Sequence, residues 1–459
     1  MPLTSTAATT TRLPAGIAGT VITPDHPDYE QARIVTYGDM FKRPGLIVRV
    51  AGPADIATAI AYARDNGLEL AVRSGGHSGA GLSSTDGGLV IDVRDLKGID
   101  IDPDASTVWA SSGVTAAELT EALAPHNLIV GFGDAGTVGV SGITLGGGVG
   151  YLSRKHGLTI DSLLAAEIVT ADGKVLIADA ENHPDLFWGL RGGGGNFGVV
   201  TRLKYRLHPL PAFTGGMLLL PATAETIAGF VKAAREAPEE LSSIANIMPA
   251  PPMPFLPAEA HGKMVIIGMM AFAGDDKAAE AALAPFRALA EPLADFVKPG
   301  PYASMYPPED DSYHPTAVSM NQMLGSIGID EAETILGYLS ESDAALRVCQ
   351  IRVLGGAVAR VPVDATAYPH RQSPIMVNYA AFYDGAADRP TKLSWLKDFA
   401  AAMHQGDDGA YVNFVNDEGP ERVKAAYAYP GATWDRLRQV KRRYDPDNLF
   451  RLNQNIPPA

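Results

Sequence analysis

The sequence predicts an α+β protein of two domains, and three observations support this prediction. The chain has 459 residues, and at about 100–200 residues per domain it should form two or three units. Up to residue 208, strand patterns alternate with helix patterns, an order typical of α+β or α/β folds. After Pro209 and Pro211 the glycine clusters give way to longer helices and strands, separated by proline-rich loops (248–257 and 299–308).

Composition excludes several classes of protein. Hydrophobic residues make up 46% and charged residues 19%, so the chain can bury a large core and is not disordered. Its net charge of −15 disfavours nucleic acid and anionic membrane surfaces as partners. No apolar stretch reaches the roughly 20 residues that span a bilayer, and residues 1–16 read as a polar tail without the apolar core of a signal peptide. Cys349 is the one cysteine, so no intrachain disulfide can form, and we expect a cytoplasmic protein with small-molecule partners.

Local signals place the elements of the first segment. A helix should begin at Pro53 and end before Gly67, because proline suits the first turn of a helix and glycine the position after its last turn. Thr115 and Glu118 form a capping box for a helix over 117–127. Strands are expected over 46–50, 68–73, 87–93 and 106–113, and in a hairpin over 165–179 turned at Asp172-Gly173.

The segment from 209 to 409 is expected to form a second domain, a sheet backed by helices. Its helix patterns lie at 223–237 and 276–296, and its strand patterns at 263–272, 349–358 and 375–383. The sequence pattern changes again from about residue 410. The segment YVNFVND is followed by an expected helix over 434–444 and then by DPDNLF.

The segment from Arg73 to Ser78, RSGGHS, follows an apolar strand. Its adjacent glycines expose backbone N–H groups and allow close approach of a ligand, as a phosphate cradle requires. His77 at its tip could serve as a base, a ligand or an attachment point. Taken alone, the segment fits a tight turn with a surface histidine better than a functional loop.

Two further glycine-rich segments follow, at 131–150 (GFGDAGTVGVSGITLGGGVG) and 187–200 (FWGLRGGGGNFGVV). The first is too poor in large side chains to pack a core. It also lacks the feeding strand and the following acidic residue of a dinucleotide-binding fingerprint. The second leads from a helix through a glycine loop into a strand. Three such loops within 200 residues predict one long cofactor that lies across all of them.

Other common chemistries lack their motifs in this chain. The sequence contains no P-loop, HExxH, CxxC or GxSxG pattern. No His, Asp and Glu residues cluster at the spacing of metal ligands, so no metal is expected.

The order and spacing of the three loops resemble the FAD domain of the vanillyl-alcohol oxidase superfamily. RSGGHS with DGGLVIDV, then VGVSGITLGGGVGYLSRKHGLTIDSL, then DLFWGLRGGGGNFGVV carry the resemblance over about 44–208. The ending, YVNF and later RLRQVKRRYDPDNLFRLNQNIP, is similar to the berberine bridge enzyme-like branch, in particular its bacterial 6-hydroxy-D-nicotine oxidase-like members. The resemblance implies a PCMH-type fold in which residues 1–208 and 410–459 bind FAD. Residues 209–409 would form an antiparallel sheet, backed by helices, that binds substrate.

The resemblance also assigns cofactor contacts. His77 matches the histidine that bonds the flavin 8α-methyl carbon, and the loop from Arg73 to Ser78 would hold the pyrophosphate through N–H groups. Val199 would lie near the adenine, and Asn453 and Asn455 near the pyrimidine edge of the flavin. The positions that match the family's cofactor contacts are Arg73, Ser74, Gly75, Gly76, His77, Ser78, Ala135, Gly136, Thr137, Gly139, Gly142, Gly147, Gly148, Val199, Asn413, Asn453 and Asn455.

One departure concerns the number of flavin bonds. Many relatives attach the flavin a second time, through a cysteine in a GxCxTVG motif. This chain has GDAGTVG, with Ala135 in the place of that cysteine. We therefore expect FAD bound covalently through His77 alone, and Cys349 should pack as a small hydrophobe.

A second departure concerns the catalytic base. Sugar- and alcohol-oxidising relatives often have Asn-Tyr where this chain has Asn413 and Phe414, and phenylalanine cannot take a proton. The lone pair of a neutral amine assists hydride loss without a base, so this departure favours C–N oxidation. Four residues could still act as the base or merely pack: Tyr411, Tyr379, Tyr383 and His370.

The resemblance implies hydride transfer from a small organic amine or alcohol to flavin N5, with reoxidation by O2 to H2O2. Val138 matches the position that controls oxygen access, where a small residue resembles the oxidases or simply packs closely. MNQMLGS, GGAVAR and MVNYAAFYD indicate a mainly apolar pocket with a few tyrosines. Three alternatives stay open: a dehydrogenase or tailoring enzyme on the same fold, a non-catalytic flavin- or ligand-binding protein, and an NADPH-using reductase.

Overall fold

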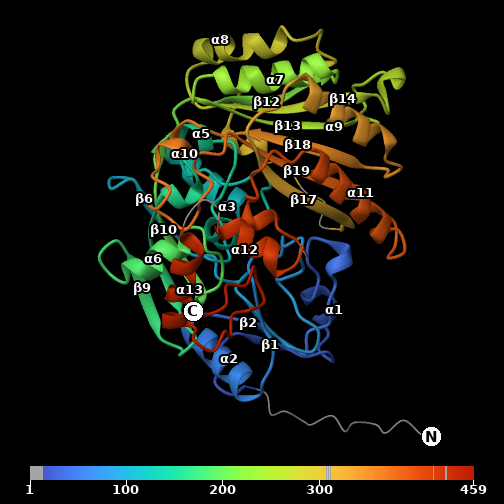
Figure 1. The fold of residues 1–459 in the computed structure, drawn as a ribbon. Helices are drawn as coiled ribbons and strands as arrows, with labels where there is room; N and C mark the ends of the chain where they lie inside the picture. Colours follow the sequence, from blue (N-terminus) through green and yellow to red (C-terminus); the bar gives the residue numbers. More distant parts are fainter. Residues whose placement is uncertain (1–13, 307, 309, 311, 417, 429–431) are drawn as a thin grey trace, which may run out of the picture.

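The computed structural model describes residues 14–306, 308, 310, 312–416, 418–428 and 432–459. Two lobes lie one above the other in Figure 1. Strands β1 to β10 and the C-terminal helix form the lower lobe, and strands β12 to β19 with their helices form the upper lobe. Both lobes mix helices with sheets, so the predicted α+β class is confirmed. The predicted domain boundaries after 208 and before 410 remain a proposal, which this division supports. Residues 1–13 of the expected polar tail lie outside the described residues.

The lower lobe contains a four-stranded and a five-stranded sheet. The first has the order β1 (Thr20–Ile22), β2 (Leu46–Arg49), β4 (Leu89–Asp92) and β3 (Leu70–Arg73). Strand β4 runs parallel to both β2 and β3. Helix α2 (Pro53–Asp65) is the crossover that connects β2 to β3. The second, antiparallel sheet has the order β5 (Ile99–Asp102), β6 (Thr107–Ser111), β10 (Val199–Arg206), β8 (Leu163–Val169) and β9 (Val175–Asp179).

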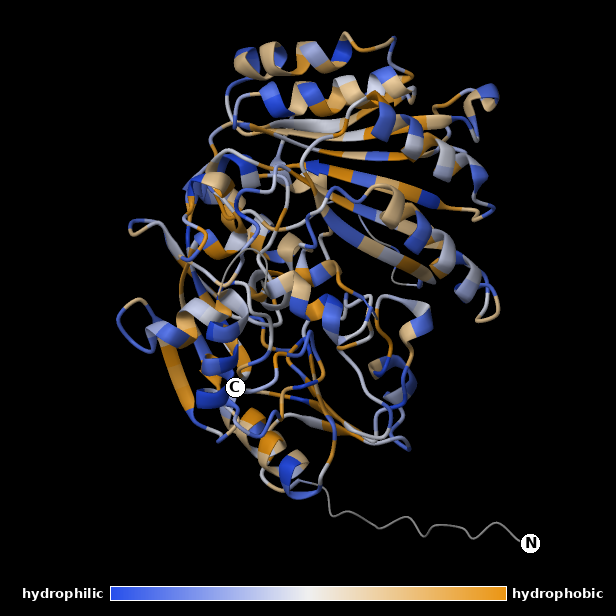
Figure 2. Ribbon diagram, in the orientation of Figure 1, coloured by the Kyte–Doolittle hydropathy of each residue, from blue (hydrophilic) through white to orange (hydrophobic). Residues whose placement is uncertain are grey.

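The upper lobe is one antiparallel sheet with helices on a single face (Figure 1). Its strand order is β15 (Ala294–Asp295), β12 (Thr214–Pro221), β14 (Met264–Phe272), β13 (Leu241–Pro249), β18 (Arg347–Val353), β19 (Ile375–Phe382) and β17 (Ala317–Leu324), and β16 (Lys298–Pro299) pairs with β12. The covering helices are α7 (Ala224–Glu236), α8 (Asp276–Arg287), α9 (Ile329–Glu341) and α11 (Arg389–Ala402). These helices carry both hydrophilic and hydrophobic residues, as Figure 2 shows, and their apolar sides pack on the sheet.

The remaining elements connect the lobes and shape the loops. Helices α3 (Ala116–Leu123), α4 (Val140–Leu145), α5 (Ser153–His156) and α6 (Pro184–Leu190) belong to the lower lobe. The tail forms α12 (Pro420–Ala428) and α13 (Thr433–Tyr444). Short elements are α1 (Tyr29–Ala32), β7 (Leu128–Ile129), β11 (His208–Pro209), α10 (Ala357–Arg360) and the 3-10 turns η1 (Gly38–Met40), η2 (Ala124–His126), η3 (Thr159–Asp161), η4 (Ala258–Ala260), η5 (Tyr302–Met305) and η6 (Val412–Phe414). None of the helices in the described ranges has both the length and the apolar character that crossing a membrane requires.

Most elements predicted from the sequence are confirmed, including the capping box of Thr115 with Glu118 and the hairpin of β8 and β9. Two predicted bounds are wrong by five residues or more. The helix expected to reach residue 296 ends at Arg287, because the following chain pairs with β12 as an edge strand. The strand expected to reach residue 358 ends at Val353, because Gly355 and Gly356 take positive φ angles of 94° and 53°.

The longer elements of the upper lobe that were not predicted are β12, β13, β17, α9 and α11. Strands β13 and β17 carry polar residues along one side, which hides the apolar pattern of a buried strand. On β17, for example, Ser319 and Asn321 interrupt an otherwise apolar run.

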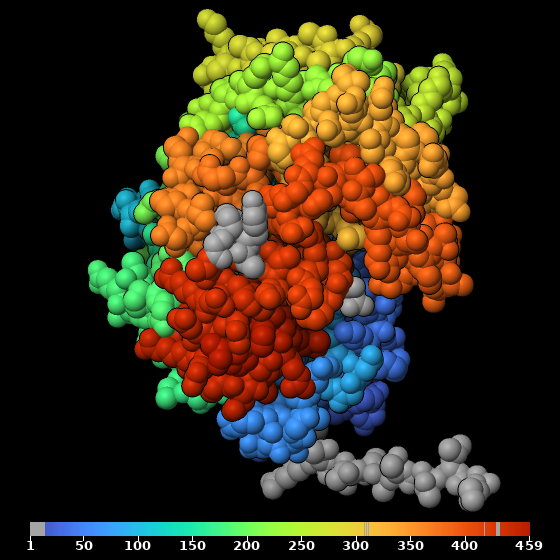
Figure 3. All heavy atoms as spheres, viewed as in Figure 1, coloured from blue at the N-terminus to red at the C-terminus, as the bar shows by residue number. Residues whose placement is uncertain are grey.

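The C-terminal segment returns to the lower lobe and packs on its third glycine loop. In Figure 1 helix α13 lies beside α6, and in Figure 3 the segment forms one continuous surface on this side of the molecule. The fully buried ammonium of Lys441 pairs with Asp445 at 2.6 Å and donates to the carbonyl oxygens of Asn196 (2.8 Å) and Phe450 (3.0 Å). Asp445 in turn accepts from the backbone N–H of Leu449 (2.8 Å). One buried charge pair therefore fixes the tail against the glycine loop.

Replacing Lys441 by Met should destabilise the protein by about 3–5 kcal/mol, because the buried carboxylate of Asp445 would lose its counter-charge. Urea-induced unfolding followed by circular dichroism measures the change. Arg443→Met on the same helix is the matched control. Its side chain is 63% exposed and pairs with Asp185, so its loss should cost less than about 1 kcal/mol. Equal losses in the two variants would contradict a special role for the buried pair.

Candidate functional site

A cavity of about 550 Å³ lies between the two lobes, and all three glycine-rich segments line it. Of the residues that the sequence analysis proposed for the site, those that line the cavity are Ser74, Gly75, Gly76, His77, Ser78, Ala135, Val138, Gly139, Gly142, Tyr411, Asn413 and Asn453. Those that do not line it are Arg73, Gly136, Thr137, Gly147, Gly148, Val199, Tyr379 and Asn455. The structure thus brings most of the proposed residues together.

The first glycine loop leaves the end of β3 and faces the second loop at close range. A Cβ atom on Gly75 would lie 2.4 Å from the backbone nitrogen of Gly139, so only glycine allows this approach. Gly76 has a φ of 79°, a conformation that glycine adopts readily. Among the described residues, none accepts a hydrogen bond from the N–H groups of Gly75, Gly76 or Ser78. These N–H groups make the loop a cradle suited to an anion.

His77 lies at the meeting point of the first two loops. Its Nε2 is 2.9 Å from the hydroxyl oxygen of Thr137, which does not itself line the cavity. The hydroxyl therefore fixes the plane of the imidazole ring and holds His77 in the cavity wall.

The Arg73 side chain does not line the cavity. The guanidinium is fully buried, pairs with Asp92 at 2.9 Å and donates to the carbonyl oxygen of Ala32 at 2.6 Å. Burial alone would raise the pKa of Asp92, but the guanidinium groups of Arg73 and Arg94 outweigh it and hold that pKa below its usual value. The resemblance assigned the N–H groups of this loop to the cofactor, and the buried Arg73 side chain supports the loop from behind.

Part of the second glycine loop packs in the hydrophobic core of the lower lobe. The sequence analysis expected it to pack no core, yet Phe132, Val140 and Leu145 are buried in the core of the lower lobe. This expectation was wrong because the loop contains helix α4, whose apolar side faces inward. Gly148 is also committed within the protein, since its N–H donates to the Tyr411 hydroxyl at 2.9 Å.

The third glycine loop contributes residues that the sequence analysis did not single out. Gly194, Gly195, Gly198 and Val200 line the cavity, whereas the side chain of Val199 packs in an apolar cluster beneath it. Alternation along β10 explains the difference, because neighbouring side chains in a strand point to opposite faces.

Asn196 of the same loop holds the C-terminal segment. Its amide donates to the carbonyl oxygens of Gly193 (2.8 Å) and Gln454 (3.0 Å) and accepts from the N–H of Ile456 (2.9 Å). This clamp brings Asn453 to the cavity wall, while Asn455 stays outside the lining.

The upper sheet supplies the polar groups that sequence reasoning missed. Gln350, Arg352 and Asn378 line the cavity from β18 and β19. The buried Arg352 guanidinium pairs with Asp134 of the second loop at 2.7 Å and lies 5.2 Å from the ring centre of Phe414. Since Asp134 and Arg352 are far apart in sequence and in different lobes, no local motif could have indicated this pair.

The candidate bases occupy different places. Tyr411 lines the cavity, and burial raises the pKa of its phenol. Tyr379 faces the helix layer, where its ring packs on Phe399 and its hydroxyl accepts from Gln322 at 2.7 Å. Tyr379 therefore lies on the opposite face of the sheet from a ligand in the cavity.

The other two candidates also lie outside the lining. Tyr383 donates its hydroxyl proton to Asp39, and His370 donates from Nε2 to the carbonyl oxygen of Ala426 at 2.8 Å. Tyr37, which the sequence analysis did not consider, does line the cavity. Burial, together with the nearby carboxylates of Asp134 and Asp39, raises its pKa. The cavity thus offers neutral phenols and no strong base of this type.

Asn413 connects the tail to helix α4. Its amide nitrogen donates to the Ile143 carbonyl oxygen (3.1 Å) and to the Tyr411 hydroxyl (2.9 Å). Gly146 leaves the room for it, because a Cβ atom there would lie 2.0 Å from the Asn413 side-chain oxygen.

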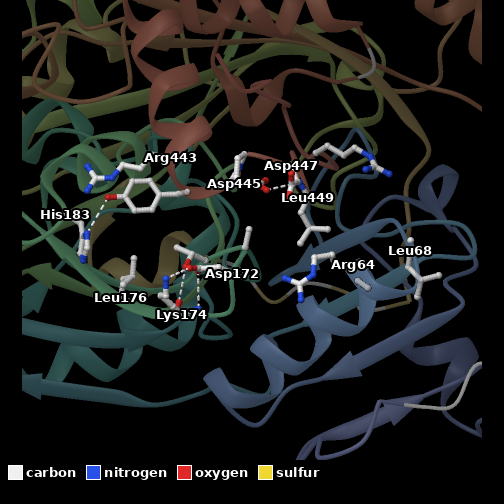
Figure 4. A pocket seen from close by; sticks show the side chains of 17 residues that line it. Arg64, Leu68, Asp172, Lys174, Leu176, His183, Arg443, Asp445, Asp447 and Leu449 are labelled. Carbon is white, nitrogen blue, oxygen red and sulfur yellow. Dashed lines mark hydrogen bonds and ion pairs between the residues drawn. The ribbon is translucent and has the colours of Figure 1, made fainter.

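A second hollow, of about 590 Å³, lies on the outside of the lower lobe (Figure 4). Seven of its 17 lining residues are charged, and Lys174 forms an ion pair with Asp172 (2.7 Å). None of the three glycine loops contributes to it, so the interlobe cavity is the candidate site.

Two protein families match the chain. The FAD binding domain family matches residues 44–179, and the family described as berberine and berberine like matches residues 410–457. The (R)-6-hydroxynicotine oxidase of Paenarthrobacter nicotinovorans is 31% identical, over 97% of this chain and 98% of that enzyme. The FAD-linked oxidoreductase YgaK of Bacillus subtilis is 29% identical, over 96% of this chain and 97% of its own.

Solved structures agree with this similarity. The crystal structure of 6-hydroxy-D-nicotine oxidase from Arthrobacter nicotinovorans superposes with a TM-score of 0.87 at 27% identity, over 98% of this chain and 100% of that one. A chitooligosaccharide oxidase gives a TM-score of 0.82 at 21% identity, over 96% and 97% of the two chains, which shows the fold alone.

Gly146→Ala should destabilise the wild-type chain by about 1–3 kcal/mol, because the added methyl group displaces the Asn413 side chain. In an Asn413→Gly background the same substitution should cost nothing, since the three nearest atoms all belong to Asn413 and the backbone at 146 suits alanine. A double-mutant cycle of unfolding free energies measures this coupling. Additive effects would mean that the two residues do not compete for the space.

Proposed function

Because the chain belongs to the berberine bridge enzyme-like family of FAD-linked oxidoreductases, we propose that it is an oxidase with FAD bonded covalently to His77 alone. Its substrate is a small organic amine or alcohol, and O2 is the electron acceptor. The observation that carries this proposal is the position of His77, held by Thr137 in the wall of a cavity that all three glycine loops line.

The residues of the cavity fit FAD. The N–H groups of Gly75, Gly76 and Ser78, for which the described part of the chain offers no acceptor, would hold the pyrophosphate. Further buried polar atoms that line the cavity have no hydrogen-bond partner among the described residues, and a polar ligand would satisfy them: the hydroxyls of Ser83 and Tyr427 and the side-chain oxygen of Asn453.

The residues around the cavity support the proposal of a single covalent bond. Ala135 lines it where a second attachment would need a thiol. Cys349 is buried on the helix-facing side of the upper sheet, and burial raises the pKa of its thiol. Since the thiolate is the reactive form, Cys349 has neither the place nor the reactivity to bond a flavin.

When bound, FAD would supply the redox chemistry, accepting a hydride at N5 and passing the electrons to O2 to give H2O2. The protein's share is to position the substrate and to exclude water. Val138 lines the cavity with a small side chain, which supports oxygen access and hence an oxidase over a dehydrogenase.

The lining favours an amine over an alcohol. Phe414 lines the cavity and can take no proton, and burial raises the pKa values of Tyr37 and Tyr411, so both phenols stay protonated at neutral pH. An alcohol needs a base to remove its hydroxyl proton, whereas an amine can use its own lone pair.

The absorption spectrum before and after acid precipitation tests the flavin bond. Flavin colour should stay in the protein pellet, and His77→Ala should release it into the supernatant. His404→Ala, which alters a half-exposed histidine outside the cavity, should keep the colour in the pellet. If the wild-type protein released all its flavin into the supernatant, the proposal of a covalent bond would be wrong. If the protein bound no flavin at all, the result would favour a protein that binds other ligands.

Anaerobic mixing with candidate substrates tests the reaction. (R)-6-hydroxynicotine, the substrate in a relative's name, heads a panel of amines and alcohols. Bleaching of the flavin, followed by H2O2 release on admission of air, is the expected result. Bleaching without H2O2 would indicate a dehydrogenase, and no bleaching by any compound would contradict an oxidase of this substrate class.

A further inference from the structure

Four amide side chains form a row across the upper sheet. The strand register aligns Asn246 of β13 with Gln350 of β18, Gln350 with Asn378 of β19, and Asn378 with Asn321 of β17. All four side chains point away from the helix layer, because their strand neighbours on either side, such as Tyr379, belong to the core beneath the helices or contact it.

Three members of the row are committed to partners within the protein. Asn321 exchanges two hydrogen bonds with the backbone of Tyr411, at 2.6 Å and 3.3 Å. Gln350 donates to the side-chain oxygen of Asn246 at 2.9 Å and accepts from the Arg352 guanidinium at 2.7 Å and 3.1 Å. Asn246 donates in turn to the Ile267 carbonyl oxygen at 3.2 Å.

Asn378 differs from these three. It lines the cavity, and its side-chain oxygen is buried with no hydrogen-bond partner in the part of the chain that the structure describes. A buried carbonyl without a partner is unfavourable, and where such a group belongs to a residue that lines a cavity, a ligand can supply the missing hydrogen bond. The glycine loops line the cavity from the lower lobe, whereas Asn378 stands in the sheet of the upper lobe.

The hydrogen bonds of Arg352 on the neighbouring strand limit the kinds of ligand that this wall can bind. Arg352 forms an ion pair with Asp134 and donates further hydrogen bonds to Gln350 and to the Val149 carbonyl oxygen. It therefore offers no open fork to a carboxylate or phosphate. The groups on this wall that can meet a ligand include two acceptors, the Asn378 oxygen and the partly exposed Asp134 carboxylate, beside the amide nitrogen of Asn378.

We propose that Asn378 is a substrate-positioning residue whose side-chain oxygen accepts a hydrogen bond from an N–H or O–H group of the substrate. The proposal rests on the function proposed above and deepens it. It assigns the substrate to compounds with a hydrogen-bond donor beside the reacting carbon.

Binding of two matched pairs of probes to the flavin-loaded protein tests this assignment. The first pair is benzylamine, as its ammonium ion, and benzyltrimethylammonium, which keeps the charge and lacks every N–H. The second pair is benzyl alcohol and benzyl methyl ether. Shifts of the flavin absorption bands under anaerobic conditions give each Kd. The donor-bearing member of at least one pair should bind about tenfold more tightly, as expected for one buried hydrogen bond.

Asn378→Leu keeps the side-chain size and should abolish that preference while leaving the flavin content unchanged. Asn246→Leu is the matched control from the same row. It lies outside the cavity lining, so the preference should survive. Asn378→Asp distinguishes the two donors, because its charge should tighten benzylamine and not benzyl alcohol.

Four outcomes would overturn the inference: no probe binds, neither pair shows a preference, the preference persists in Asn378→Leu, or Asn246→Leu abolishes it equally. Loss of flavin from Asn378→Leu would also overturn it, by making Asn378 a cofactor contact. Failure of the proposed function is a separate result, because bleaching of the flavin reports turnover and band shifts report binding.

Discussion

The ammonium of Lys441 is the contact on which the cavity depends. It is fully buried, and it ties helix α13 to the backbone of the third glycine loop and of the tail at once. A glycine loop has no side chains with which to hold its own shape, so other segments must hold it. Gly193 shows how closely they do so: a Cβ atom there would lie 2.8 Å from Leu437 of α13. Segments far apart in the sequence therefore build one wall together.

The upper sheet faces two different environments with one set of strands. Residues such as Val377 and Tyr379 pack beneath the helices, and the positions between them carry amides and a guanidinium toward the cavity. Period-two alternation lets a strand satisfy the core and the site separately. The helix layer stabilises the sheet, and the cavity face stays open to polar residues that contribute little to the core.

The sequence predicted the lower lobe and its loops better than the upper wall of the cavity. Glycine clusters, the Thr115 capping box and the tail are local or fixed in spacing, so they can be recognised without knowing which strands pair. Asn378 and Arg352 carry no such signal. Their position facing the cavity follows from strand register, and the partner of Arg352 lies in the other lobe. Tyr379 was misplaced for the same reason, since a one-residue step along a strand reverses the face that a side chain reaches.

The charges of the cavity largely compensate one another before any ligand arrives. Arg352 is neutralised by Asp134, and burial keeps Tyr37 and Tyr411 protonated by raising their pKa values. Coulombic attraction from this wall therefore gives little discrimination among substrates, because the paired charges cancel at the distance of a ligand. Selection falls instead to shape and to the few hydrogen-bonding atoms that the protein leaves unpaired. A neutral wall also leaves a bound amine free to use its lone pair, since no buried countercharge holds it in the protonated form.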